Sequence, residues 1–322
     1  MTFTLTKTTF GGFSTLTVKG AGARAEIAEF GATLLSWSVG GVELIDGYAT
    51  PSELQDQAGV RSGIMVPFSN RIPAGRYRFD GRDFDYETGG EAVMHGMLRE
   101  VEFEVIGVET DEGSASVHFT TSELRPGRYA GYPFAVDVAV DVTITARGVE
   151  FAITGTNVGD EAAPFGSGWH PYFRIGANPI EQLDLVIPAR TRIVPGLGLI
   201  PLEGTEAFVP VEGEWDFTHA RPIGDQVIDM AFFDLETGDD GLVHTTLSDG
   251  TTILDVWQER GGMHVFTADT VPRPRKSFAM EPIEFVTNAA NRPDQAQAIR
   301  LEPGASRTFR FGAAASSTLE HQ

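Results

Sequence analysis

The stretch FAVDVAVDVTITARGVEFAITG, residues 134–155, decides the fold. Apolar residues alternate with Ala, Asp and Thr from Phe134 to Ile144, so apolar side chains line one face of an extended chain and mostly polar ones the other. The alternation resumes after Arg147 and Gly148. The stretch therefore predicts two antiparallel strands joined as a hairpin and half-buried.

Shorter alternating runs repeat this pattern along the chain, at residues 35–39, 101–105 and 115–119. Two Asp-Gly pairs, Asp80-Gly81 and Asp249-Gly250, stand between apolar segments. Each pair predicts a tight hairpin with a type I′ turn, because that turn needs positive φ at both central residues.

Helical periodicity is scarce and extends over only about one or two turns, at residues 51–58 and 294–298. The 37 glycines and 18 prolines are spread along the whole chain as turn residues, with no linker or internal repeat. We therefore predict an all-β protein of layered antiparallel sheets. It would form one domain over residues 1–315, followed by a loose tail over residues 316–322.

Charge and composition exclude several classes of function. The 322 residues include 24 Lys and Arg against 45 Asp and Glu, a net charge of −21. Nucleic acids and anionic membranes bind clustered basic residues, so neither is an expected partner. The lack of cysteine excludes disulfides and thiolate chemistry. Because neither a signal peptide nor an apolar run of 18 residues is found, we expect a cytoplasmic protein. We also expect it to be a monomer or a homodimer.

Two of the seven histidines stand in unusual surroundings. His95 lies between apolar residues and a glycine, and His170 follows Trp169, whose flat face suits the C–H face of a sugar ring. For each of the two, a catalytic role and a buried structural role are both open. His264, at a predicted strand start, is interpreted as structural. The remaining histidines are expected on sheet faces, on the surface or in the tail: His118, His219, His244 and His321.

Two acidic residues and one Asn-Arg pair complete the candidate set. Glu281 is apolar on both sides in SFAMEPI, residues 277–283, so desolvation should raise its pKa and suit it to act as a general base. A buried ion pair of Glu281 with Arg71 is the alternative. Asp229 is a second acid in an apolar run. Asn70 and Arg71 could bind vicinal hydroxyls or a carboxylate, or stabilise a turn.

Taken in order, these residues resemble the aldose 1-epimerase (mutarotase) family. The matching motifs are Asn70-Arg71-Ile72, His95-Gly96, Trp169-His170-Pro171-Tyr172-Phe173 and Glu281-Pro282. Their order and separations also fit, over about residues 10–312, and His-Pro-Tyr-Phe is the most specific of them. The resemblance implies a galactose mutarotase-like β-supersandwich with an open sugar groove. It also implies an isomerase that acts on a hexose and needs no metal or other cofactor.

The resemblance also implies roles for three catalytic residues. Glu281 is similar to the family's general base, His170 to its general acid, and His95 to the histidine that polarises the sugar near its ring oxygen. Exchange of α and β anomers needs one proton removed from the C1 hydroxyl and one delivered to the ring oxygen. The ring opens to the aldehyde, C1 rotates, and the ring closes on its other face. A carboxylate and an imidazole tuned near neutrality can perform both transfers.

The resemblance assigns the remaining residues to binding. Arg71 with Asn70 would orient the sugar, Asp229 would hold its hydroxyls, and Trp169 would pack nearby. Arg99 departs from this pattern, because an Arg shortly after His-Gly also occurs in relatives that act on phosphorylated hexoses. An anion pocket for a phosphorylated or sulfonated hexose is therefore an alternative, built from Arg71, Arg76, Arg99, Arg125 and Arg128. The proline after Glu281 places the chain nearer a less studied bacterial branch, whose sugars are poorly defined.

Three rival classes remain. A sugar-binding protein without catalysis would not need both histidines and the glutamate together. A glycoside hydrolase usually needs two carboxylates at the scissile bond, whereas the matched set has one. A metal site of His95, His170 and a carboxylate has the right composition, but its residues lie far apart in the sequence. We therefore favour the epimerase of a neutral hexose.

Overall fold

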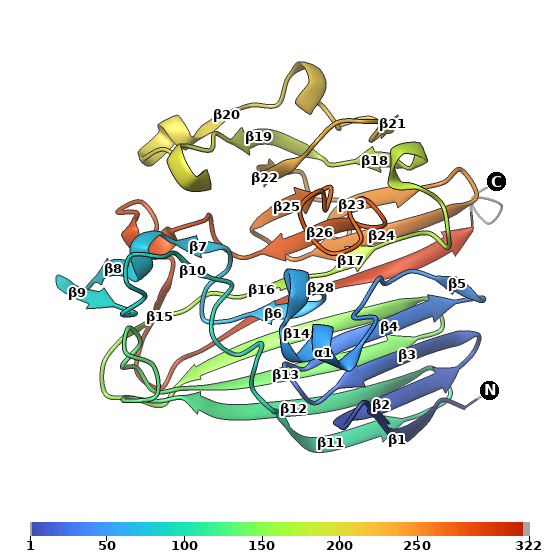
Figure 1. Cartoon of the computed structure of the whole chain (residues 1–322), viewed down its shortest axis with the longest axis horizontal. Coiled ribbons are helices and arrows are strands. Elements are labelled where there is room, and N and C mark those ends of the chain that lie inside the picture. The colour runs from blue at the N-terminus through green and yellow to red at the C-terminus, as the bar shows by residue number, and fades with distance from the viewer. Residues whose placement is uncertain (1, 318–322) are drawn as a thin grey trace.

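Antiparallel strand pairs build the computed structural model, which describes residues 2–317 (Figure 1). The predicted hairpin lies in its largest sheet, of nine strands, and Ile144 pairs with Val149 across it. In spatial order these strands are β11 (Glu104–Thr110), β12 (Ser114–Leu124), β13 (Val136–Thr145), β14 (Gly148–Asn157), β28 (Ser306–Ser317), β24 (Thr252–Gln258), β23 (Val243–Ser248), β18 (Asp184–Val186) and β21 (Arg221–Pro222). Buried and half-buried residues alternate strictly along β13, which confirms the expected half-buried strand.

A second large sheet packs against the first and carries the candidate site. Its spatial order is β20 (Phe208–Pro210), β19 (Ala189–Ile193), β22 (Asp229–Leu235), β25 (Gly262–Phe266), β26 (Phe278–Ile283), β16 (Gly168–His170) and β6 (Gly63–Met65), with β17 (Tyr172–Phe173) also paired to β26. One continuous apolar cluster joins the two sheets, and it includes Phe151 and Phe311 of the first and Trp169 of the second. This confirms the prediction of layered antiparallel sheets with a shared core.

A third sheet and several short pairs complete the layers. The five N-terminal strands pair in chain order: β1 (Thr4–Phe10), β2 (Phe13–Gly20), β3 (Ala23–Ala28), β4 (Thr33–Val39) and β5 (Val42–Glu43). The short pairs are β7 (Arg71–Ile72) with β10 (Val93–Met94), β8 (Arg76–Phe79) with β9 (Arg82–Asp85), and β15 (Ala163–Pro164) with β27 (Arg300–Leu301).

Helices are short, as expected. The α-helix α1 (Pro51–Gln55) lies within the first predicted helical segment, and Thr50 caps it by accepting from the Glu53 N–H. The second, residues 294–298, forms only turns. The 3₁₀ helices are η1 (Ala58–Val60), η2 (Pro73–Gly75), η3 (Ile180–Gln182), η4 (Leu197–Leu199), η5 (Gly204–Ala207), η6 (Gly213–Trp215) and η7 (Ala289–Asn291). Between residues 2 and 317 no helix is long and apolar enough to cross a membrane.

The two Asp-Gly turns have different outcomes. Asp80 (φ 50°) and Gly81 (φ 75°) both adopt positive φ between β8 and β9, as predicted. At Asp249-Gly250 the predicted hairpin forms between β23 and β24, but the predicted type I′ turn does not, because of the two only Gly250 has positive φ and the flanking pair is Ser248 with Ile253. The Asp249 carboxylate accepts hydrogen bonds from two backbone N–H groups further along the loop, which stabilises a wider turn.

The predicted C-terminal boundary needs one correction. Strand β28 continues to Ser317, two residues into the segment expected to be a loose tail, because it pairs with β24 as far as Thr252. The rest of that segment, residues 318–322, lies outside the described residues.

Candidate active site

Four titratable side chains lie on four adjacent strands of the second large sheet. In the pairing of β25 with β26, His264 stands directly opposite Glu281. Gly168 of β16 pairs with Ile283, so His170, two residues on, comes level with Glu281 from the other side. Asp229 begins β22, diagonal to His264. Because side chains two apart share a face of a strand, these residues form a line across one face, here called the polar row: His170, Glu281, His264 and Asp229.

The Asn70-Arg71 motif and His95 lie together beside this row. The short pair of β7 and β10 sets Arg71 opposite Met94, and the His95 N–H donates to the Asn70 carbonyl at 2.8 Å. Both Asn70 (φ 55°) and His95 (φ 59°) have left-handed backbone conformations, which Asn and His adopt more readily than most non-glycine residues. At Gly96 a Cβ atom would lie 2.0 Å from the Val66 carbonyl oxygen, so only glycine allows this close approach.

A cavity of about 200 Å³ opens above the polar row. This volume is below the roughly 300–1,000 Å³ of sites for drug-sized ligands, so it suits a molecule as small as one monosaccharide. Six of the eight residues proposed from the sequence line it: Asn70, Arg71, His95, His170, Asp229 and Glu281.

Trp169 does not line the cavity, contrary to the expectation that its ring packs near the sugar. Neighbouring residues of a strand point to opposite faces, so Trp169 points into the core when His170 points into the cavity. It is fully buried, with its ring centroid 4.7 Å from that of Phe151 and 5.7 Å from that of Phe311. Its indole N–H donates to the Ser62 carbonyl at 3.2 Å.

Arg99 also lies outside the cavity lining. Its guanidinium donates to the Met94 carbonyl at 2.6 Å and approaches Glu100 at 3.4 Å, so it stabilises the loop that carries His95. Three other arginines of the alternative anion pocket bind carboxylates elsewhere, in the pairs Arg76–Asp85, Arg125–Asp137 and Arg128–Glu123. Arg71 is therefore the one member of that set in the cavity lining.

His170 and Glu281 form a buried acid/base pair. Their Nε2 and Oε1 atoms lie 3.3 Å apart. Burial raises the pKa of Glu281 to about 8 and lowers the pKa of His170 to about 3. Burial also lowers the pKa of His95, which packs edge-on against His170. The Oε2 of Glu281 and the Nδ1 of His170 are buried and make no hydrogen bond within residues 2–317.

His264, interpreted as structural from the sequence, is part of the site. Its Nε2 lies 2.9 Å from Oδ1 of Asp229. Burial alone would lower the pKa of His264, but the carboxyl groups of Glu281 and Asp229 outweigh it and raise that pKa. Burial would likewise raise the pKa of Asp229, yet the hydrogen bond and charge of His264 lower it. The two residues therefore behave as an ion pair beside Glu281. Cross-strand register, which sequence alone does not give, was needed to find this histidine.

Tyr172 is a second residue that sequence reasoning did not select. Its ring stacks on His170 with centroids 5.1 Å apart and an interplanar angle of 25°. The guanidinium of Arg61 lies 4.5 Å from the centroid of the same ring and is fully buried. Arg61 is in turn bound by Asp46 at 2.7 Å. This stack limits the orientations open to His170.

Three residues have the composition and spacing of a metal site. One ligand atom each from His95, His170 and Glu281 can be chosen so that all lie within 4.8 Å of one another. The wide separation of these residues in the sequence therefore does not exclude a metal site. The same cluster can transfer protons without an ion, because His170 already contacts Glu281 directly.

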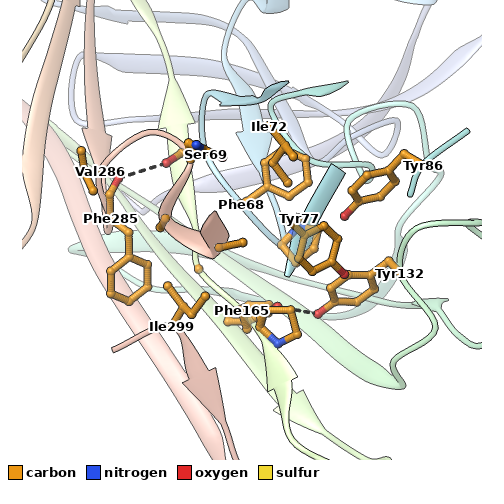
Figure 2. A pocket seen from close by; sticks show the side chains of 16 residues that line it. Phe68, Ser69, Ile72, Tyr77, Tyr86, Tyr132, Phe165, Phe285, Val286 and Ile299 are labelled. Atoms are coloured by element: carbon orange, nitrogen blue, oxygen red, sulfur yellow. Dashed lines mark hydrogen bonds between the residues drawn. The ribbon is translucent and has the colours of Figure 1, made fainter. Parts of the chain in front are cut away.

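A separate apolar pocket of about 30 Å³ lies behind the Asn70-Arg71 segment. Figure 2 shows the rings of Phe68, Tyr77, Tyr132 and Phe165 around it, with the Ser69 hydroxyl donating to the Phe285 carbonyl at 3.5 Å. None of its lining residues is charged, so it offers packing for the segment that carries Arg71 rather than acid/base chemistry.

Comparisons with known proteins find a family model, curated relatives and solved structures that are similar to this chain. The family model described as Aldose 1-epimerase matches residues 14–313. Uncharacterized protein YihR of Escherichia coli is 26% identical over 234 residues, 71% of each chain. Galactose 1-epimerase from Lactobacillus acidophilus has a similar structure (TM-score 0.83, 16% identity, 98% of both chains). A galactose mutarotase-like protein from Clostridium acetobutylicum is also similar (TM-score 0.85, 14% identity, 98% of this chain and 99% of that one).

Proposed function

Because the chain belongs to the aldose 1-epimerase family, we propose that it interconverts the α and β anomers of a neutral aldohexose by acid/base ring opening and closure. One observation carries the proposal: Nε2 of His170 and Oε1 of Glu281 lie 3.3 Å apart in the wall of a monosaccharide-sized cavity. Anomer exchange needs one group that takes a proton and one that gives a proton, and this pair supplies both.

The pair begins the reaction with a single proton. With a pKa of about 8 on Glu281 and about 3 on His170, that proton rests on the carboxyl group at neutral pH. A sugar hydroxyl that donates to Glu281 stabilises the carboxylate, and the proton moves across the 3.3 Å contact to His170. Glu281 is then the base and His170 the acid.

Ring opening follows from these two groups. The Glu281 carboxylate takes the proton of the C1 hydroxyl while the His170 imidazolium gives its proton to the ring oxygen. The C1–O5 bond breaks and C1 becomes an aldehyde. After rotation about C1–C2 the steps reverse, and the ring closes on the other face with the pair restored. His95, packed against His170 with ring centroids 5.0 Å apart, holds the ring-oxygen end.

The remaining polar residues suit a neutral sugar. Arg71 and Asn70 offer donors from one side of the cavity and Asp229 offers an acceptor from the sheet. An anionic hexose would bring its charge close to Asp229, whose pKa His264 holds low and which is therefore ionised at neutral pH. Since Arg99 and its neighbours lie elsewhere and the His264 cation is paired with Asp229, Arg71 alone would remain to bind that anion.

The test is anomer exchange measured by NMR saturation transfer at C1, with glucose, galactose, glucose 6-phosphate and 6-sulfonated glucose. We expect exchange well above buffer for a neutral sugar. Glu281→Gln and His170→Asn should each lose most of it, by about 100-fold or more. His118→Asn is the control, because His118 binds Asp141 on another sheet.

Three results would contradict parts of the proposal. Near wild-type exchange by Glu281→Gln or His170→Asn would overturn those roles. Preference for the anionic sugars would favour an epimerase of phosphorylated or sulfonated hexoses. No exchange with any sugar, by protein that is folded, would favour a sugar-binding protein without catalysis.

A further inference from the structure

The proposed acid His170 lacks the partner that usually orients a catalytic histidine. In such a histidine one ring nitrogen acts on the substrate, while a hydrogen bond to the other fixes the ring. Here Nε2 lies 3.3 Å from Glu281, but the buried Nδ1 makes no hydrogen bond to any other residue from 2 to 317. A contact other than a hydrogen bond at Nδ1 must therefore orient the imidazole.

The flat face of the imidazole rests on the ring of Tyr172, which also lines the cavity. Side chains two residues apart in an extended segment share one face, and Pro171 between the two rings fixes its own φ. His95 meets the imidazole at an interplanar angle of 82°, so it contacts an edge and leaves the flat face to Tyr172. The stack on Tyr172 therefore sets the plane of the His170 ring.

The same tyrosine ring carries the guanidinium of Arg61, which is fully buried. One terminal nitrogen of Arg61 donates to the carboxylate of Asp46 at 2.7 Å and to the hydroxyl of Ser277 at 3.3 Å. The other donates to the Pro272 carbonyl at 2.6 Å. Because acceptors hold both terminal nitrogens, the guanidinium cannot turn away from the ring without breaking these bonds.

Small neighbours leave the Tyr172 ring a single place. Ala268 and Ala279 are buried against it, and Phe266 lies edge-on to it with centroids 6.5 Å apart. Tyr172 pairs with Ala279 of β26, two residues before the proposed base Glu281. The strand that carries the base therefore also seats the ring on which the acid rests.

The segment that carries Arg61 also holds the backbone of the acid. Ser62, the next residue, donates its N–H to the His170 carbonyl at 2.8 Å. Gly63 of β6 then pairs with His170. One short segment thus fixes the backbone of His170 directly and acts on its side chain through Arg61 and Tyr172.

We propose that Tyr172 and Arg61 are positioning residues for the acid: Arg61 fixes the Tyr172 ring, and the stack on that ring keeps Nε2 of His170 directed at Glu281. This inference rests on the proposed function. It requires the ring of Tyr172 and not its hydroxyl. An imidazole that is free to turn would leave the 3.3 Å contact, and the proton would no longer pass between acid and base.

The experiment measures kcat and KM for anomer exchange by NMR, with glucose or galactose, whichever the wild-type protein exchanges faster. Tyr172→Leu removes the stack, so we expect kcat to fall by about 10-fold or more while KM stays within about threefold. Tyr172→Phe keeps the ring, and it should retain kcat within about threefold. The fall in kcat alone and its rescue by phenylalanine separate positioning from sugar binding.

Arg61→Lys tests the second positioning residue, and it keeps the inference testable if Tyr172→Leu does not fold. Lysine retains the charge but cannot bind Asp46 and Pro272 together in the geometry of a guanidinium, so kcat should fall by about 10-fold. Arg273→Lys is the matched control. Arg273 also approaches Asp46, at 3.6 Å, but does not cover the Tyr172 ring, so kcat should stay within about threefold.

Four results would overturn this inference alone. They are wild-type kcat in Tyr172→Leu, an equal loss of kcat in the Leu and Phe variants, a rise in KM without a change in kcat, and equal losses in the two lysine variants. An equal loss in the Phe variant would assign the function to the hydroxyl. Failure of the folded wild-type protein to exchange any sugar would instead overturn the proposed function, so the two failures are distinct.

Discussion

Nε2 of His170 lies 3.3 Å from Oε1 of Glu281, and both side chains are buried in one wall of the cavity. Burial moves their pKa values apart, up for Glu281 and down for His170, so the carboxyl group carries the proton at neutral pH. The pair holds two protons below about pH 3, one between about pH 3 and 8, and none above. Because the reaction passes one proton in and one out, the singly protonated pair is the active form.

The pH dependence of catalysis follows from this count. We expect kcat/KM to be nearly level from mildly acidic pH to about pH 7 and to fall as pH rises through about 8, where the pair loses its remaining proton. Saturation transfer at C1 over pH 5–10 measures it, after the spontaneous rate in buffer is subtracted. A kcat/KM that instead rises through pH 8 would show that Glu281 acts as an independent base.

Removing the charge of His264 should shift the pH at which kcat/KM falls on the alkaline side. The His264 cation lowers the pKa of Glu281, so His264→Gln should shift the alkaline fall of kcat/KM to higher pH. The same change should reduce kcat/KM by about 100-fold, because Asp229 loses the partner 2.9 Å away that holds it in place. His244→Gln is the control, since His244 binds Asp240 and Asp255 on the other large sheet. An unmoved alkaline limb in His264→Gln would contradict this electrostatic role.

Arg61 should contribute far more to the free energy of unfolding than an exposed arginine does. Its guanidinium is fully buried, contacts Asp46 at 2.7 Å and covers the Tyr172 ring. Arg61→Met removes the buried cation from Asp46, which is left with Ser277 and the more distant Arg273, and takes the donor from the Pro272 carbonyl. We therefore expect a loss of about 3 kcal/mol in the free energy of unfolding. Arg76→Met, which breaks an exposed pair with Asp85, should cost less than about 1 kcal/mol. Denaturant unfolding of both variants checks the difference, and equal losses would contradict it.

Metal removal should leave activity unchanged. His95, His170 and Glu281 are close enough to bind a divalent ion, but the proposed proton transfers need only the His170–Glu281 contact. Dialysis against a chelator, followed by metal analysis and the NMR assay, separates these cases. Loss of exchange that zinc or manganese restores would identify the cluster as a metal centre.

Much of the fold could be predicted from sequence, because burying one face of a strand makes apolar residues recur at every second position. The alternation of residues 134–144 appears directly as β13, and Asp80-Gly81 forms its turn as predicted. The same logic failed at Asp249, where side-chain hydrogen bonds to the backbone favour a wider loop. Local patterns do not show which of two competing turn geometries a side chain will stabilise.

The candidate site was predictable where a motif is continuous in sequence. Asn70, Arg71, His95, His170, Asp229 and Glu281 were chosen from sequence and all line one cavity. Three other residues depended on information that motifs lack. Strand register brings His264 opposite Glu281, and strand alternation turns Trp169 into the core when His170 faces the cavity. The guanidinium of Arg99 donates to a carbonyl group of its own loop instead of facing the cavity.

The buried Glu281 should lower the free energy of unfolding of the protein, by an amount that depends on pH. Its pKa is about 8 in the folded protein against 4.5 in an unfolded chain. Below pH 4.5 both states hold the proton, and titration of this group does not alter stability. Between pH 4.5 and 8 the unfolded chain releases the proton while the folded protein keeps it, so stability falls as pH rises. Above pH 8 both states are ionised and the loss stays constant.

Glu281→Gln removes this titration, so its stability relative to wild type should grow from pH 4.5 to 8 and then level off, about 5 kcal/mol higher. Chemical unfolding at pH 5, 7 and 9 measures the trend. Glu284→Gln is the control, because Glu284 is similarly buried but pairs with Arg260 at 2.7 Å. That substitution removes a buried carboxylate charge that pairs with Arg260 and lies near Arg307, and it should destabilise the protein. A stability gain of Glu281→Gln that does not change with pH would mean that Glu281 is ionised in the folded protein.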